Sequence, residues 1–186
     1  MIIPSAEEQL RFLGGIQRII DEGSFVATYK FALLMALADF AVQSGLDGND
    51  PEKISTAELA EGFIYSYWRQ AVPYASSRSD SSLLLRMSHG NQPVVFNQIV
   101  LLRQKYQGSL TALRSSKTDW QRLKREVAAT IAKMPLWKLQ VIGGKPVCLL
   151  YHQEGQGYQG RQINLLSGTL YNLRHHYDLV RNLVRS

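Results

Sequence analysis

Residues 25–42 have the sequence Phe25-Val-Ala-Thr-Tyr-Lys-Phe-Ala-Leu-Leu-Met-Ala-Leu-Ala-Asp-Phe-Ala-Val42, which is apolar on nearly every side when wound into a helix. A helix that is apolar all round is stable only when other elements surround it. This segment therefore predicts a central helix around which the other helices pack.

Only Lys30 and Asp39 interrupt this apolar run. At about 100° per residue, positions nine apart lie on opposite faces of a helix, so the two charges cannot pair with each other. Burying a charge without a partner costs several kcal/mol. Arg69 is therefore a candidate partner for Asp39, and Asp21 or Glu22 for Lys30. Two interpretations stay open: both charges fix the packing of a helical core, which is the commoner case, or Lys30 contacts a ligand in a pocket.

Two capping boxes mark the starts of the neighbouring helices. Ser5-Ala-Glu-Glu8 predicts a first helix that runs to about Asp21, and Ser55-Thr-Ala-Glu58 predicts another that ends before Pro73. The aromatic residues within 63–70 are expected to supply packing area. The first helix is expected to bury an apolar stripe made of Leu10, Leu13, Ile16 and Ile20, flanked by Phe12 and Ile19.

Helical patterns continue after a serine-rich loop at residues 75–82. We expect a short helix near residues 83–87, a turn at 88–92 and a helix that is opened by Pro93 and ends near Tyr106. A long amphipathic helix is expected over residues 117–134. Its buried side is expected to contain Leu123, Val127, Ile131 and Met134.

The pattern then changes from helical to extended. Trp137-Lys-Leu-Gln-Val-Ile142 and Pro146-Val-Cys-Leu-Leu-Tyr151 flank Gly143-Gly144, which predicts a hairpin in which Cys148 is a buried strand residue. Residues 162–166 predict a third short strand. Ser167 is expected to cap one last helix, whose apolar seam is Leu170, Leu173, Tyr177, Val180 and Val184. The predicted fold class is mainly α (α+β), a helical bundle around a central apolar helix, with a small antiparallel β hairpin or three-stranded sheet near the C-terminus.

The net charge of +6 conceals an asymmetry along the chain. Residues 1–80 contain 6 Lys/Arg and 11 Asp/Glu, a net charge of −5, whereas residues 81–186 contain 15 and 4, a net charge of +11. The sequence thus predicts an acidic part of three helices over 1–80 and a basic part over 81–186, packed as one compact domain.

The basic part predicts contact with a polyanion, because each phosphate that Lys or Arg contacts releases counterions and adds affinity. The alternative is an ordinary solvated surface. On the long helix Arg122, Arg125 and Lys133 fall on one side, and on the last helix three arginines follow one edge of the seam. We expect DNA as the partner, bound by Arg122, Arg125, Lys133, Lys138, Lys145, Arg174, Arg181 and Arg185.

No complete active site is recognisable in the sequence. His175 and His176 are adjacent and point about 100° apart on a helix, which is poor geometry for joint metal binding. His89 lies beside Asn91 in a predicted turn, which is more often a surface loop than a site. The glycine-rich loop at 155–160 lacks a phosphate-binding fingerprint. We therefore predict no catalytic residue, no metal ligand and no cofactor in these residues.

The N-terminus lacks the features of a signal peptide, and no apolar run is long enough to span a bilayer. A cytoplasmic location, without membrane contact, is expected.

Three segments resemble the N-terminal region of certain bacterial HNH endonucleases: Ser24-Phe-Val-Ala-Thr-Tyr-Lys-Phe-Ala-Leu-Leu34, Tyr67-Trp-Arg-Gln70 and Pro135-Leu-Trp-Lys-Leu-Gln140. The likeness covers most of the chain, and residues 171–185 resemble the element that leads into the HNH module of that family. No HNH module occurs in these residues. The resemblance implies a recognition or scaffolding role in DNA restriction or phage defence. It carries over no catalytic residue, and it implies a divalent metal only if an HNH module follows.

Three functions therefore stay open. The first is a nucleic-acid-binding or target-recognition domain of an HNH-type nuclease. The second is a stand-alone, winged-helix-like DNA-binding regulator whose wing is the hairpin at Gly143-Gly144. The third is a protein interaction or dimerisation module that uses the seam from Leu170 to Val184 and the aromatic helix. If it dimerises, a homodimer through the C-terminal helix is expected.

Overall fold

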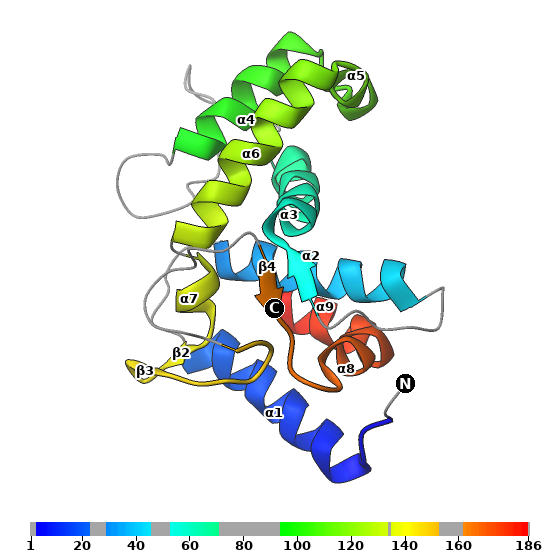
Figure 1. The fold of residues 1–186 in the computed structure, drawn as a ribbon, viewed down its shortest axis with the longest axis vertical. Coiled ribbons are helices and arrows are strands. Elements are labelled where there is room, and N and C mark those ends of the chain that lie inside the picture. Colours follow the sequence, from blue (N-terminus) through cyan, green and yellow to red (C-terminus); the bar gives the residue numbers. More distant parts are fainter. Residues whose placement is uncertain are drawn as a thin grey trace, which may run out of the picture.

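The computed structural model describes residues 3–22, 29–45, 53–70, 94–133, 135–152 and 162–185. These residues form nine helices and four short strands (Figure 1). The predicted fold class is confirmed, because the described part is mainly helical with small antiparallel strand pairs. None of the described helices combines the length and the apolar character that crossing a membrane requires.

Helix α2 (Tyr29–Ser44) is the central helix that the apolar run predicts. It packs against α3, α7, α8 and α9. Leu33, Leu37 and Ala38 are completely buried, as expected for a helix that is apolar on all sides. Figure 1 shows α2 crossing the middle of the molecule, with α3 above it and α8 and α9 below it. The prediction of a surrounded apolar helix is confirmed.

The two charges of α2 contact groups other than those expected. The Lys30 ammonium donates to the carbonyl oxygens of Ile19 at 3.4 Å and Ile20 at 2.6 Å, both near the end of α1 (Ala6–Glu22). Carbonyls in the last turn of a helix lack intrahelical donors, so a cation is a favourable partner there. Burial lowers the pKa of Lys30, and the nearby Asp21 carboxylate partly opposes this shift.

Asp39 accepts a hydrogen bond from the Tyr177 hydroxyl at 2.6 Å. The prediction that Asp39 pairs with Arg69 is therefore wrong. Arg69 is exposed on α3. These contacts support the interpretation in which Lys30 and Asp39 fix the packing of the helical core.

Helix α1 begins at the predicted capping box. The Ser5 N–H donates to Glu8 Oε2 at 2.7 Å, and the Glu8 N–H donates to Ser5 Oγ at 3.3 Å. The buried stripe is Phe12, Ile16 and Ile19. Leu10 is 70% exposed, so its predicted place in the stripe is wrong. The reason is that α1 contacts α9 and β2, and Leu10 lies away from the face that they cover.

Helix α3 (Thr56–Gln70) follows strand β1 (Lys53–Ser55) and also begins at its predicted capping box, which Ser55 and Glu58 form. Phe63 and Tyr67 are completely buried, and Tyr29 of α2 stacks on Phe63 with 5.6 Å between ring centroids. The prediction that these aromatic side chains pack in the core is confirmed.

Helices α4 (Val94–Lys105), α5 (Leu110–Ser115) and α6 (Lys117–Lys133) pack with α3 at one end of the molecule (Figure 1). The helices expected over residues 93–106 and 117–134 are confirmed, whereas α5 was not expected. Leu123, Val127 and Ile131 are buried as predicted. Residues 75–82, 83–87, 88–92 and 155–160, for which a boundary, a helix, a turn and a loop are predicted, lie outside the described residues, as does Met134.

The predicted hairpin is much shorter than expected. Residues 137–139 belong to helix α7 (Pro135–Leu139), and the paired strands are only β2 (Val141–Ile142) and β3 (Lys145–Pro146). Gly143 and Gly144 form the turn with positive φ angles of 56° and 77°. Cys148 is exposed, so its predicted burial is wrong.

The buried Gln140 side chain explains why the second predicted strand does not pair in the hairpin. Gln140 Oε1 accepts from the N–H groups of Leu149 at 2.9 Å and Leu150 at 2.6 Å, and its Nε2 donates to the Tyr151 carbonyl at 3.0 Å. One amide side chain thus satisfies backbone groups that would otherwise need a neighbouring strand.

The predicted third strand is β4 (Gln162–Asn164), but its partner is β1, more than a hundred residues earlier. The pair is antiparallel, with Ile54 opposite Ile163, and both side chains are completely buried. Tyr151 and Leu165 form an isolated antiparallel bridge beside it.

The last predicted helix is two helices, α8 (Thr169–His175) and α9 (Tyr177–Arg185), and the capping position is Gly168 rather than Ser167. The helix is interrupted at His176, where φ is −106° and ψ is 25°. The break lets α8 pack on α2 while α9 also reaches α1. Leu170, Leu173 and Val180 of the predicted seam are buried within the chain.

Candidate nucleic-acid interface

The outer face of α6 carries the cations that the sequence predicts there. Arg122, Arg125 and Lys133 are all exposed, on the side of the helix opposite the buried Leu123 and Val127. From Arg122 to Lys133 the helix rises about 16 Å. Among the residues that the structure describes, neither Arg125 nor Lys133 has an ion-pair partner.

One buried carboxylate holds two cations beside this face. Asp119, which is 7% exposed, accepts from Lys105 Nζ at 2.6 Å, from the Tyr106 hydroxyl at 2.7 Å and from Arg122 Nη2 at 3.2 Å. The hydrogen bond from Lys105, followed by that from Tyr106, lowers the pKa of Asp119. The ionised carboxylate therefore holds Lys105 and Arg122 in place and leaves this group with one excess positive charge.

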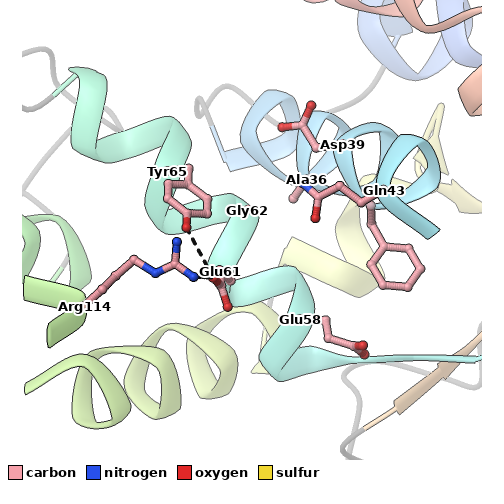
Figure 2. A pocket seen from close by; sticks show the side chains of 9 residues that line it. Ala36, Asp39, Gln43, Glu58, Glu61, Gly62, Tyr65 and Arg114 are labelled. Carbon is pink, nitrogen blue, oxygen red and sulfur yellow. Dashed lines mark hydrogen bonds and ion pairs between the residues drawn. The ribbon is translucent and has the colours of Figure 1, made fainter. Parts of the chain in front are cut away.

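A second carboxylate, Glu61 on α3, does the same on the other side of α6. It pairs with Arg114 Nη2 at 3.1 Å and with Lys124 Nζ at 3.0 Å (Figure 2 shows Arg114). The Arg114 guanidinium also lies 5.7 Å from the centroids of the Tyr65 and Trp120 rings, a distance at which cation–π attraction acts. Sequence reasoning missed both groups, and only Asp119–Arg122 has a local signal, the spacing of three on one helix.

A cavity of about 400 Å³ lies between α2, α3 and α5, and it contains three carboxylates, from Asp39, Glu58 and Glu61 (Figure 2). Each one is already bonded: Asp39 to Tyr177, Glu58 to its capping box, and Glu61 to its two cations. Glu61 also accepts from the Tyr65 hydroxyl at 3.3 Å, and burial raises the pKa of Tyr65. Because all three acids have structural partners, we assign this cavity no catalytic pair.

The elements that follow α6 contain two more of the predicted cations, Lys138 and Lys145. Figure 1 shows α7 directly after the C-terminal end of α6, with the β2–β3 turn beyond it on the same side of the molecule. Lys138 of α7 is half-buried, with its ammonium 5.4 Å from the centroid of the Trp137 ring, and Lys145 of β3 is exposed. We call these five residues the basic edge: Arg122, Arg125, Lys133, Lys138 and Lys145.

Of the three C-terminal arginines, the structure describes the side chains of Arg174 and Arg181, and both are half-buried. Arg174 turns inward, and its Nε donates to the Ala41 carbonyl at 2.8 Å, near the end of α2. A carbonyl in the last turn of α2 needs such a donor, so Arg174 acts as a helix cap. Arg181 is half-buried, and the side chain of Arg185 lies outside the described part.

His175 is the last residue of α8, and His176 lies between α8 and α9. The rings of His175 and His176 are perpendicular, with centroids 4.9 Å apart, and His176 Nε2 lies 3.1 Å from Gln9 Oε1. Burial, followed by the charge of His175, lowers the pKa of His176. Within the described ranges, no three His, Cys, Asp or Glu side chains are grouped so that they could hold a metal ion. His89 lies outside those ranges.

Comparison with known proteins gives a family but no activity. No curated protein and no solved structure is detectably similar to the chain. A family model described as "Domain of unknown function (DUF8808)" matches residues 9–140, which extend from the first turn of α1 through α7. Because this match spans well over half of the 186 residues, the chain belongs to the family described as a domain of unknown function, DUF8808.

Proposed function

We propose that this domain binds the sugar–phosphate backbone of a nucleic acid through the basic edge. The observation that carries the proposal is the exposed stripe Arg122–Arg125–Lys133, which faces away from the core and contains two cations without an ion-pair partner among the described residues. The sequence around the stripe adds to its field, since residues 94–152 contain 10 Lys/Arg and 2 Asp/Glu.

The spacing of the stripe also suits a phosphate backbone. Its length of about 16 Å equals the rise of about five nucleotides of one strand in duplex DNA. Asp119 fixes the guanidinium of Arg122 at one end, which lowers the entropy lost when that group contacts a phosphate. Contacts of this kind favour binding that depends on charge and spacing rather than on base sequence.

A salt titration of binding to duplex DNA tests the proposal. The variant Arg125→Ala/Lys133→Ala removes two phosphate contacts, so the slope of log K against log salt is expected to become shallower by about 1.8. The matched control is Lys53→Ala/Arg69→Ala, which removes two exposed cations of β1 and α3 that do not belong to the basic edge, and is expected to keep the wild-type slope. If both double variants keep that slope, the basic edge is not the contact surface.

The HNH resemblance supplies a setting for this proposal, the target-recognition part of a nuclease in DNA restriction or phage defence. In that setting the gene is expected to encode an HNH motif next to this domain, and the full product is expected to cleave DNA only with a divalent metal. A full product that binds DNA and leaves it intact with Mg²⁺ or Mn²⁺ would contradict the nuclease setting while leaving the binding proposal in place.

The two alternatives from the sequence stay predictions without a specific observation in their favour. A winged-helix regulator needs a hairpin that reaches DNA, and the hairpin here has two residue pairs. A dimer through the C-terminal seam needs an accessible seam, and Leu170, Leu173 and Val180 are buried within the chain.

A further inference from the structure

A second cavity, of about 330 Å³, lies in the groove between α4 and α6. It adjoins the basic edge, because Arg122 lines the cavity and also belongs to the exposed stripe of α6. Its volume is at the lower end of the range of small-ligand sites, about 300–1,000 Å³. The other lining residues are Gln98, Leu101, Leu102 and Lys105 of α4, and Leu123 and Glu126 of α6.

Two hydrogen-bond acceptors of this cavity have no partner in the described part of the chain. The side-chain oxygen of Gln98 is buried and accepts no hydrogen bond. A buried acceptor without a donor destabilises the fold, so a donor that reaches it is bound favourably. Gln98 lines the cavity, and the last torsion of a glutamine side chain is soft, so its amide can reorient. The half-buried carboxylate of Glu126 also has no ion-pair partner among these residues.

The other residues that line the cavity are leucines and two cations. Leu102 and Leu123 are buried, whereas Leu101 is 63% exposed. Lys105 and Arg122 are held side by side by Asp119. The cavity thus combines apolar surface, two unused acceptors and two fixed cations.

We propose that this cavity takes one unstacked nucleobase that carries an exocyclic amine. Gln98 and Glu126 accept hydrogen bonds from the amine, the leucine side chains contact the flat faces of the base, and Lys105 and Arg122 contact the adjoining phosphates. Unpaired bases are recognised in this way, by apolar contact with their faces and hydrogen bonds to their edges. The inference rests on the proposed function and adds to backbone binding a preference for nucleic acids with an unpaired base.

Oligo(dC) and oligo(dU) of equal length separate this inference from backbone binding. Both have the same charge, but cytosine has an exocyclic amine and uracil has a carbonyl at that position. The domain is expected to bind oligo(dC) about fivefold more tightly, the equivalent of one buried hydrogen bond, with the same salt slope for both.

The variant Gln98→Met assigns the preference to the cavity. Methionine keeps the unbranched shape and removes the buried acceptor, so the dC/dU ratio is expected to fall toward one while the melting temperature stays the same or rises. Gln104→Met is the matched control, since Gln104 is exposed on the same helix and does not line the cavity, and this variant is expected to keep the wild-type ratio.

The outcomes distinguish the two proposals. Equal affinity for oligo(dC) and oligo(dU), with a normal salt slope, overturns the nucleobase site and leaves backbone binding intact. A preference that survives Gln98→Met also overturns the site. The absence of binding to both oligonucleotides and to duplex DNA at low salt overturns both proposals.

Discussion

The charges around α2 and those on α6 differ in what they contact. At α2, Lys30, Asp39 and Arg174 are each bonded to a backbone carbonyl or a tyrosine hydroxyl of another element. On the outer face of α6, Arg125 and Lys133 have no ion-pair partner among the described residues. The presence of a charged residue in the sequence therefore does not indicate by itself whether the charge is structural or binds a ligand. The unsatisfied backbone groups nearby decide whether the charge stabilises the fold or remains available for a ligand.

The largest expected effect is at Lys30. Lys30→Met keeps most of the side-chain volume but leaves the carbonyls of Ile19 and Ile20 without this donor. We expect a loss of about 2–3 kcal/mol in the free energy of unfolding, measured by urea denaturation. Lys133→Met on the exposed face of α6 is the control and is expected to stay within about 0.5 kcal/mol of wild type. Similar losses in the two variants would remove the distinction between the two groups of charges.

The next effect concerns the bond between α9 and α2. Tyr177→Phe removes the hydroxyl that donates to Asp39 at 2.6 Å. Because the acceptor is a carboxylate, we expect a loss of about 1.5 kcal/mol, measured by the same denaturation. Tyr171→Phe, on the half-exposed face of α8, is the comparison and is expected to change the stability less. A neutral Tyr177→Phe would mean that Asp39 does not need this donor.

A smaller effect is expected from two helical glycines. A Cβ at Gly62 would lie 3.0 Å from the Cβ and 3.1 Å from the Cα of Ala36, where α3 meets α2 beside the acidic cavity. Gly62→Ala is therefore expected to destabilise the protein by about 1 kcal/mol, despite the higher helix propensity of alanine. Gly14 of α1 has nothing within 4 Å of such a Cβ, so Gly14→Ala is expected to gain up to about 1 kcal/mol. Opposite signs in thermal melting would confirm the close approach of α2 and α3.

The smallest expected effect is the pH dependence contributed by His176. Burial lowers the pKa of His176 from its ordinary value of 6.5, so the unfolded chain binds the proton more readily than the folded chain. This contribution to stability is fully present above pH 6.5 and is lost as the pH falls below it. In His176→Gln, the decrease in melting temperature from pH 7 to pH 5 is expected to be shallower than in wild type. If the melting temperature of His176→Gln falls as much as that of wild type, His176 does not cause this pH dependence.

Much of the helical scaffold could be predicted because its signals are local. The Ser5–Glu8 and Ser55–Glu58 capping boxes act over three residues, and the structure contains both. The buried face of α6 follows from its own periodicity. The strand expected over 137–142 failed for a tertiary reason: Gln140 satisfies the backbone of residues 149–151 through its side chain, and the preceding residues form α7.

In the candidate site, too, the local features could be predicted and the contacts between distant segments could not. The exposed stripe of α6 could be predicted, because one helix places its residues. The pairing of Glu61 with Lys124, 63 positions later, and of Arg174 with Ala41, 133 positions earlier, could not. Nothing in the local sequence of Arg174 distinguishes a helix cap from a phosphate ligand.

The amino-acid sequence alone determined the apolar central helix and the starts of α1 and α3, because each depends on residues within a few turns. It also determined the charge asymmetry, which is a property of composition. Packing between distant segments assigned the partners of Lys30 and Asp39, paired β4 with β1 and broke the last helix at His176. The physical reason is that a hydrogen-bonding group takes the nearest unsatisfied partner in space, and the fold of the whole chain determines which partner that is.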